Sequence, residues 1–206
     1  IKEQHSAINH ISEALQGLIM QVRMMPVSLI FQRLPRVVRD LAHQLDKKVD
    51  LVVEGEETEA DKNVIELLLE PLIHLVRNSI GHGIESTAIR REQGKNEVGQ
   101  IRIRAWQESD SVCLEVSDDG QGIDPEKVRQ RISKMGLLAA EKINQLTDHE
   151  IIQYCFMAGL STDAKVSGLS GRGVGMDVVH STVEQLGGTV TLHSEVGQGT
   201  QAVLSL

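Results

Sequence analysis

Three short motifs follow one another along the chain, and their order constrains its fold and function more than any other feature. They are HLVRNSIGH at residues 74–82, DDGQG at residues 118–122 and GRGVG at residues 171–175. The first places polar side chains on a predicted helix, the second a carboxylate in a glycine turn, and the third a glycine-rich segment before another helix. Each motif is weak alone, but together they predict a site for a magnesium nucleotide.

The composition is compatible with one domain, or one domain and an appendage, around an aliphatic core. Of the 206 residues 40% are apolar, but only 2% are aromatic. The formal net charge of −8 and the lack of a basic run argue against nucleic-acid binding. No apolar run approaches the ~20 residues that cross a bilayer, and no signal peptide is recognised, so we expect a cytoplasmic protein without membrane insertion.

A heptad pattern over residues 1–25 predicts a helix with a narrow apolar stripe. One seam holds Ile1, Ile8, Leu15 and Val22, and the other holds Gln4, Ile11, Leu18 and Met25. So narrow a stripe needs a partner helix, and we favour one from a second copy of the chain over packing against its own domain. Pro26 separates this helix from the rest of the chain.

Apolar periodicity in the remaining sequence predicts both helices and strands. Helices are expected at 27–45, 62–80 and 173–186, and strands at 49–54, 101–105, 112–116, 189–193 and 200–206. Pro35 should kink or restart the first helix, and Asp61 is a candidate N-cap of the second. The strands are apolar on one face only, which predicts a mixed sheet covered by helices on one side, with 49–54 at its edge. Residues 125–170 are polar with short amphipathic stretches, such as 128–138 and 150–156, and so long an irregular segment is expected to be a functional lid.

His74, Asn78 and His82 are spaced four residues apart, so they lie along one face of the second helix. A carboxamide oxygen is a hard ligand that suits Mg²⁺, and an imidazole one turn away can hold a metal-bound water or accept a proton. The alternative is an exposed polar stripe. The helix is otherwise largely apolar, so polar groups on it need partners or line a cavity.

Asp118 follows an apolar strand and precedes Gly120 and Gly122. Glycines allow the backbone to approach a flat ligand closely, and an ionised carboxylate accepts hydrogen bonds only, which suits the exocyclic amine of adenine. The alternative is an ordinary acidic turn. The neighbouring Asp119 is expected to face solvent.

Gly171, Gly173 and Gly175 alternate with other residues directly before a predicted helix. Free amides at a helix N-terminus bind phosphate, so this segment is a candidate phosphate site. It fits neither the Walker A pattern nor the dinucleotide-binding glycine motif. A flexible linker is the alternative, but it does not explain glycines at every second position against a helix.

Together these motifs resemble the ATPase superfamily shared by histidine kinases, DNA gyrase, MutL and the large heat-shock ATPase chaperone. Within it the chain is most similar to chemotaxis histidine kinases of the CheA type. The resemblance covers nearly the whole chain. It is carried by HLVRNSIGHGIE at 74–85, SDDGQGID at 117–124, FMAGLST at 156–162 and LSGRGVGMDVV at 169–179.

The resemblance implies an α/β (α+β) two-layer sandwich that holds ATP between helices and a mobile lid. Residues 1–25 would be the second half of a dimerisation hairpin, and residues 26–206 the ATP-binding catalytic domain. Asn78 would bind Mg²⁺, His82 would support the metal or the phosphates, and His74 would be the general base. Asp118 would bind the adenine amine. The other ATP-binding residues by resemblance are Gly120, Gly122, Ser161, Thr162, Lys165, Gly171, Arg172, Gly173, Val174 and Gly175.

By the same resemblance, the chain would transfer the γ-phosphoryl group of ATP to a histidine on a separate phosphotransfer domain. Expected partners are a second copy of the chain, a response regulator, a receptor and a coupling protein. CheA-like chains have Asp where this chain has Gly81, so a catalytically impaired nucleotide-binding scaffold is one alternative. A conformational ATPase with water as the acceptor is another, against which His74 argues because it replaces the usual glutamate.

Overall fold

The computed structural model describes residues 23–157 and 175–206. Its elements, in chain order, are β1 (Met24–Pro26), α2 (Ser28–Phe31), α3 (Leu34–Gln44), β2 (Val49–Glu54), β3 (Glu59–Asp61), α4 (Lys62–Asn78), η1 (Ser79–Gly83), α5 (Thr87–Glu92), β4 (Gly99–Glu108), β5 (Ser111–Asp118), α6 (Pro125–Lys134), α7 (Ala140–Gln145), α8 (Asp148–Gln153), η2 (Tyr154–Phe156), α9 (Met176–Gln185), β6 (Thr189–Glu195) and β7 (Gly199–Ser205).

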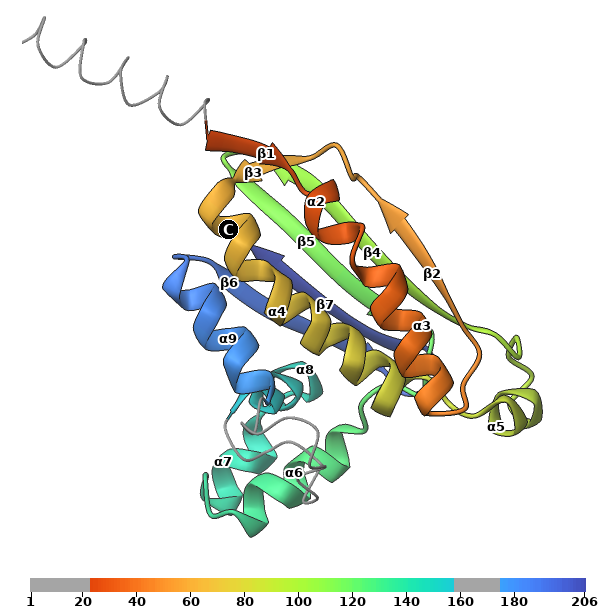
Figure 1. Cartoon of the computed structure of the whole chain (residues 1–206). Helices are drawn as coiled ribbons and strands as arrows, with labels where there is room; N and C mark the ends of the chain where they lie inside the picture. The colour runs from red at the N-terminus through yellow and green to blue at the C-terminus, as the bar shows by residue number, and fades with distance from the viewer. Residues whose placement is uncertain (1–22, 158–174) are drawn as a thin grey trace, which may run out of the picture.

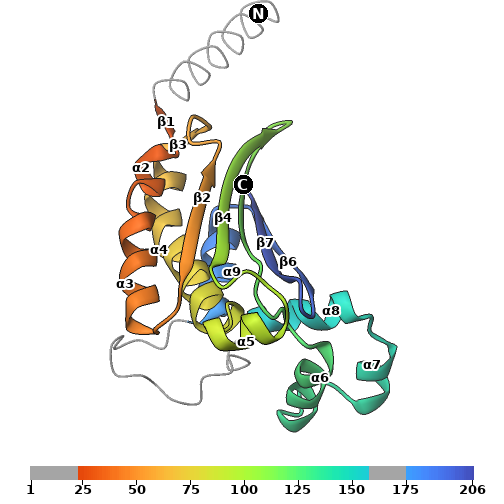
Figure 2. The same ribbon diagram turned by 90° about the vertical axis from the view of Figure 1, so that its right-hand side faces the viewer.

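Five strands form one mixed sheet in the order β2-β4-β5-β7-β6. Strands β2 and β4 are parallel, whereas the other neighbours are antiparallel. Helices α3, α4 and α9 lie on one side of this sheet and form the second layer (Figures 1 and 2). The predicted two-layer α/β fold with a mixed sheet is therefore confirmed, including the position of residues 49–54 at the edge.

The alternation of side chains along β4 explains why one face of the sheet is covered. Ile101, Ile103 and Ala105 are at most 4% exposed, while Arg102 and Arg104 between them are solvent-exposed. Successive residues of a strand point to opposite faces, so the apolar set meets the helices and the charged set lies on the other face. The main core between sheet and helices is aliphatic, as the composition predicts.

Helix α4 is the central helix of the second layer, and its two ends determine where the site lies. Asp61 is its N-cap, as predicted, and accepts a 2.8 Å hydrogen bond from the Asn63 amide. At the other end the helix does not run regularly to Ile80. The backbone widens into the π-helical turn η1, in which the Ile84 amide donates to the Ser79 carbonyl at 2.7 Å. Such turns are frequent at functional sites.

The segment before α4 differs in part from the predicted pattern. The predicted dimerisation helix lies mostly in residues 1–22, outside the described residues. Met24 and Met25 belong to strand β1, which pairs with β3, so helix does not extend to Met25. The predicted helix at 27–45 is interrupted, and α3 begins again with Pro35 in its first turn, where a missing amide donor has no cost.

The prediction that residues 125–170 are irregular is wrong for the part that the structure describes, although the amphipathic stretches 128–138 and 150–156 do fall largely on helices. Residues 125–156 form α6, α7, α8 and η2, which pack around a small apolar cluster of Val128, Ile132, Ile143 and Ile151. Side-chain N-caps start two of these helices: Asp124 caps α6, and Thr147 forms a capping box with Glu150 on α8. The lid motif itself falls largely on residues 158–174, outside the described residues.

Helix α9 begins at Met176, and its N-cap is Gly175. The final hairpin of β6 and β7 turns at Gly197-Gln198 and joins the sheet as predicted. In the described part of the chain, none of the helices combines the length and the apolar character needed to span a membrane.

Candidate nucleotide-binding site

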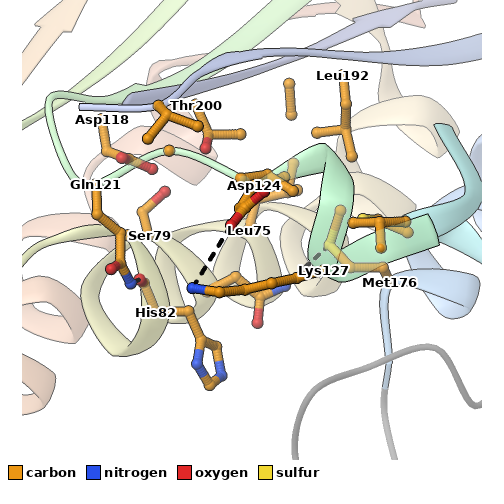
Figure 3. A pocket seen from close by; sticks show the side chains of 18 of the residues that line it. Leu75, Ser79, His82, Asp118, Gln121, Asp124, Lys127, Met176, Leu192 and Thr200 are labelled. Atoms are coloured by element: carbon orange, nitrogen blue, oxygen red, sulfur yellow. Dashed lines mark hydrogen bonds and ion pairs between the residues drawn. The ribbon is translucent and has the colours of Figure 1, made fainter. Parts of the chain in front are cut away.

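A cavity of about 540 Å³ opens where the end of α4, the turn after β5, the start of α6 and the start of α9 meet (Figure 3). This volume is in the range of small-molecule sites. Of the predicted site residues, Asn78, His82, Asp118 and Gly122 line it. Apolar side chains form much of the remaining wall, namely Leu75, Val116, Ile123, Val128, Met176, Leu192 and Ala202.

Asp118 is the last residue of β5 and is only 9% exposed. Burial raises the pKa of its carboxyl, whereas hydrogen bonds from Ser79, Gly120 and Thr200 act in the opposite direction. The Gly120 amide donates to Oδ1 at 3.0 Å. The result is a buried, partly satisfied hydrogen-bond acceptor beside an apolar wall.

The first and second motifs interlock through their backbones. The Gln121 amide donates to the Gly83 carbonyl at 2.9 Å, and the Gln121 side chain donates to the His82 carbonyl at 2.7 Å. A Cβ atom at Gly83 would lie 2.8 Å from the Asp118 carboxylate oxygens, and one at Gly120 would collide with the Gly83 carbonyl. The missing side chains of Gly83 and Gly120 let the turn η1 and the turn after β5 approach each other, and this close approach fixes the position of Asp118.

Asn78 connects the first motif to the start of α9, since its side-chain amide donates to the Met176 sulfur at 2.9 Å. His82 lies on the opposite side of the cavity from Asp118 (Figure 3). The three polar residues that were predicted to share one face of the helix therefore do not all reach the cavity. Asn78 and His82 line the cavity, but His74, one turn earlier, does not.

His74 is half-buried on α4, which packs against α9. Partial burial lowers its pKa, Arg77 and His82 lower it further, and Asp177 in the first turn of α9 acts in the opposite direction. The imidazole is therefore neutral at neutral pH. A neutral imidazole can accept a proton or orient another ring by a hydrogen bond.

Several other predicted residues are not brought into the cavity wall. Gly120 and Gly175 do not line it, although Gly120 supports Asp118 from behind and Gly175 precedes α9. The predicted residues of the lid and of the glycine loop lie outside the described residues; they are Ser161, Thr162, Lys165, Gly171, Arg172, Gly173 and Val174.

The structure adds residues that the motifs did not single out. Ser79, Gly83, Lys127, Arg131 and Thr200 line the cavity. Ser79 lies within the first motif and Gly83 directly follows it, so both could have been expected near the site from their place in the sequence. Thr200 is placed by register alone, because it pairs with Asp118 across β5 and β7. Lys127 lies at the rim and forms a 3.8 Å ion pair with Asp124 (Figure 3).

Asp119 corrects another expectation, because it is not a free solvent-facing residue. Its carboxylate accepts from Arg90 at 2.7 Å and from the Gln100 amide at 2.8 Å. Both partners lie far from Asp119 in the sequence, so the motif contains no signal for these bonds.

The cavity also allows a test of whether a metal ion fits. Among the described residues, no group of three His, Cys, Asp or Glu side chains could enclose a metal ion. A Mg²⁺ ion held mainly by phosphate oxygens and water needs only one or two protein oxygens. The Asn78 carboxamide supplies one at the cavity wall, so the residues fit a nucleotide-bound Mg²⁺ and not a metal held by the protein alone.

The fold and the motifs agree with what comparisons show. Residues 68–206 match the family described as histidine kinase-, DNA gyrase B- and HSP90-like ATPases. The catalytic domain of histidine kinase ThkA has the same fold, with a TM-score of 0.53 at 14% identity over 89% of this chain and 92% of that one. The chain belongs to the family of histidine kinase-, DNA gyrase B- and HSP90-like ATPases.

Within this family the chain is similar to chemotaxis kinases. It is 49% identical to the chemotaxis protein CheA of Treponema pallidum over 97% of its length and 24% of that protein. It is 41% identical to the sensor histidine kinase CheAY of Helicobacter pylori over 98% of its length and 25% of that protein. The chain thus spans about a quarter of these relatives. The predicted resemblance to CheA is confirmed, and neither alternative, scaffold or conformational ATPase, is favoured.

Proposed function

We propose that this chain is the ATP-binding catalytic domain of a chemotaxis histidine kinase and transfers the γ-phosphoryl group of ATP to a histidine on a separate phosphotransfer domain. One observation carries the proposal. A buried acceptor, Asp118, lines a largely apolar cavity together with two polar side chains, Asn78 and His82, and His82 lies at the opposite edge of the cavity from Asp118 (Figure 3). This polarity matches a ligand with a flat base at one end and phosphates at the other.

At the adenine end, the Asp118 carboxylate accepts a hydrogen bond from the exocyclic amine. The apolar wall beside it excludes water from the base, which strengthens a hydrogen bond made in the interior. Gly122 adopts a positive φ of 71°, and a side chain there would collide with the Glu195 backbone. The turn therefore needs glycine at this position to pass under the base.

At the phosphate end, Asn78 and His82 face the polyphosphate, and the glycine loop at 171–175 supplies amides before α9. When bound, Mg²⁺ on Asn78 would neutralise charge on the transferred group. Phosphoryl transfer passes through a loose transition state, so alignment and charge neutralisation contribute more than covalent chemistry. The lid residues Ser161, Thr162 and Lys165 and the loop residue Arg172 would complete this end.

The acceptor imidazole attacks the γ-phosphorus with a neutral nitrogen, and the bond from the γ-phosphorus to its bridging oxygen breaks to release ADP. A base must orient the acceptor ring by its other N–H group. His74 has the required neutral imidazole, because burial lowers its pKa. We assign it this role, with the acceptor approaching from the α4–α9 side.

The wider organisation follows the relatives, of which this chain spans about a quarter. We propose that residues 1–25 belong to a dimerisation hairpin and residues 26–206 to the catalytic domain. A cytoplasmic homodimer would receive its input from a receptor through a coupling protein. A response regulator would take the phosphoryl group from the phosphotransfer domain.

A transfer assay tests the proposal. The chain is mixed with γ-labelled ATP, Mg²⁺ and a chemotaxis-type histidine phosphotransfer domain. We expect acid-labile label on that domain, and none when its acceptor histidine is replaced by Gln. Steady ATP hydrolysis without an acceptor, and no transfer, would instead indicate a conformational ATPase. Asn78→Ala should abolish transfer, and wild-type transfer from that variant would overturn the role given to Asn78.

A further inference from the structure

A buried ionic cluster lies directly behind the adenine end of the cavity. The Glu85 and Arg90 side chains are 3% and 1% exposed, and Lys95 is 19% exposed. Arg90 donates to one Glu85 oxygen at 3.0 Å and Lys95 to the other at 2.8 Å. Burial raises the pKa of Glu85, but the bonds from Lys95 and Arg90 outweigh it and leave that pKa below its ordinary value.

Burying charges is costly unless good geometry and further hydrogen bonds compensate, and Arg90 and Lys95 each make further hydrogen bonds. Both reach the turn after β5. The Asp119 carbonyl accepts from Lys95 at 2.9 Å and from Arg90 at 3.2 Å, and the Gly120 carbonyl accepts from Lys95 at 2.7 Å. The Asp119 carboxylate accepts from Arg90 at 2.7 Å.

The turn held in this way is the one that presents Asp118. The Gly120 amide donates to Asp118 Oδ1, so fixing the carbonyls of this peptide segment also fixes the donor that orients the carboxylate. Neither Arg90 nor Lys95 lines the cavity. Arg90 lies on α5 and Lys95 follows three residues after the end of that helix, and both therefore act on a ligand only through the turn.

We propose that Arg90 and Lys95 are positioning residues for nucleotide binding, which hold the Asp118–Gly120 turn in the shape that the adenine end requires. This inference rests on the proposed function. Removing Lys95 should loosen the two carbonyls and weaken a contact that substrate and transition state share. Loss of such uniform binding raises KM and leaves kcat unchanged.

The chain offers a matched control in the last turn of α5, close to Lys95 in the sequence. Arg91 forms an ion pair with Glu97 at 2.6 Å, but its side chain is 70% exposed and it touches no part of the turn. Lys95→Met and Arg91→Met therefore each remove one cation and one carboxylate partner, and only Lys95→Met removes bonds to the turn.

The experiment measures the Kd of ADP by calorimetry and records amide NMR spectra of the free proteins. We expect Lys95→Met to weaken ADP binding about tenfold, to shift the Gly120 amide resonance, and to raise KM for ATP without lowering kcat. Arg91→Met should match the wild type in each measurement. A folded Lys95→Met protein with wild-type ADP affinity, or with an unshifted Gly120 amide, would overturn the proposal.

Two further outcomes are covered. Should Lys95→Met fail to fold, Asp119→Ala removes the Arg90 contact from a side chain that is 43% exposed; it should weaken ADP binding in the same way, and unchanged binding would overturn the proposal. Should the wild-type chain itself bind no ADP, the proposed function fails. If the wild-type chain binds ADP and the variants bind it equally well, this inference is rejected while the proposed function is not.

Discussion

Asp118 combines two properties that oppose each other, burial and a role that needs negative charge. Burial raises the pKa of its carboxyl despite hydrogen bonds from Ser79 and from the Gly120 and Thr200 backbone. The ionised form accepts the adenine amine, and the protonated form loses acceptor strength. Because the folded pKa lies above the usual value, the ionised fraction should begin to fall at a higher pH than for an exposed aspartate.

We therefore predict that ADP affinity decreases as the pH is lowered through this raised pKa. Calorimetric titrations between about pH 4.5 and 8, together with circular dichroism to confirm that the fold persists, provide the measurement. In Asp118→Asn, the weak binding that remains should not vary with pH over the same range. An ADP affinity of the wild type that stays constant until an ordinary aspartate would protonate contradicts this assignment.

Two glycines in the π-helical turn have opposite surroundings, which gives a paired test. A Cβ atom at Gly81 meets nothing within 4 Å, whereas one at Gly83 would lie 2.8 Å from the Asp118 carboxylate. Gly81→Ala should keep ADP affinity and change the free energy of unfolding by less than about 1 kcal/mol. Gly83→Ala should weaken ADP binding at least tenfold. Equal effects of the two substitutions on affinity would contradict the packing described for this turn.

Gly81 also bears on catalysis, because CheA-like chains have Asp at this position. Lys47 donates to the carbonyls of Ile80 and Gly81 at 2.6 and 2.9 Å, so a cation already holds this turn. The open space means that Gly81→Asp is compatible with the fold. Comparing its transfer rate with that of the chain as it stands separates nucleotide binding from phosphoryl transfer.

At the scale of elements, the small helical cluster α6–α8 is attached to the sheet at its edge strand. The Gln153 side chain pairs with the Leu192 backbone on β6, donating to its carbonyl at 2.7 Å and accepting from its amide at 3.0 Å. This pairing satisfies backbone groups of an edge strand and holds α8 beside it. Since η2 follows directly, Cys155 is thereby held at the cavity wall.

We predict that Gln153→Ala lowers the free energy of unfolding by about 1–3 kcal/mol, since it leaves partly buried backbone groups without their partner. Urea unfolding measures the loss, and hydrogen exchange should localise it to residues 148–156 and to Leu192. Gln130→Ala on α6 is the matched control, because Gln130 is solvent-exposed, and it should change stability by less than about 0.5 kcal/mol. Similar losses in both variants would argue against this anchor.

At the scale of the whole molecule, the parts that sequence predicts well are those with strong periodicity. Strand β4 alternates cleanly between buried and exposed side chains, so its two faces, the mixed sheet and the one-sided helical layer follow from the pattern, whereas residues 113–116 of the central strand β5 are all buried. The amphipathic stretches 128–138 and 150–156 indicate parts of α6 and α8, but the packed cluster α6–α8 does not follow from the sequence, because each helix is short and the shared core consists of a few apolar side chains. The π-helical turn has no signature in apolar spacing either.

The site divides in the same way. Motifs identify three of the site residues. Asn78 and His82 stand out because polar side chains are unusual on a largely apolar helix. Asp118 stands out because glycines follow it at the end of an apolar strand. The bonds of Arg90 and Lys95 to the turn after β5 join residues that are 24–29 positions apart, and only the fold reveals them. Thr200 likewise depends on strand register.

Because the cavity is built from segments distributed along the chain, a bound nucleotide should stabilise the whole domain. At a free ADP concentration of 100 times Kd, linkage gives about 2.7 kcal/mol, which thermal unfolding detects as a raised Tm. With Asn78 as the protein oxygen for Mg²⁺, removing Mg²⁺ by EDTA at a fixed ADP concentration should reduce the shift. Asn78→Ala should show the smaller shift whether or not Mg²⁺ is present. A wild-type shift that does not depend on Mg²⁺ would contradict a metal at Asn78 and would leave the adenine end as the main source of affinity.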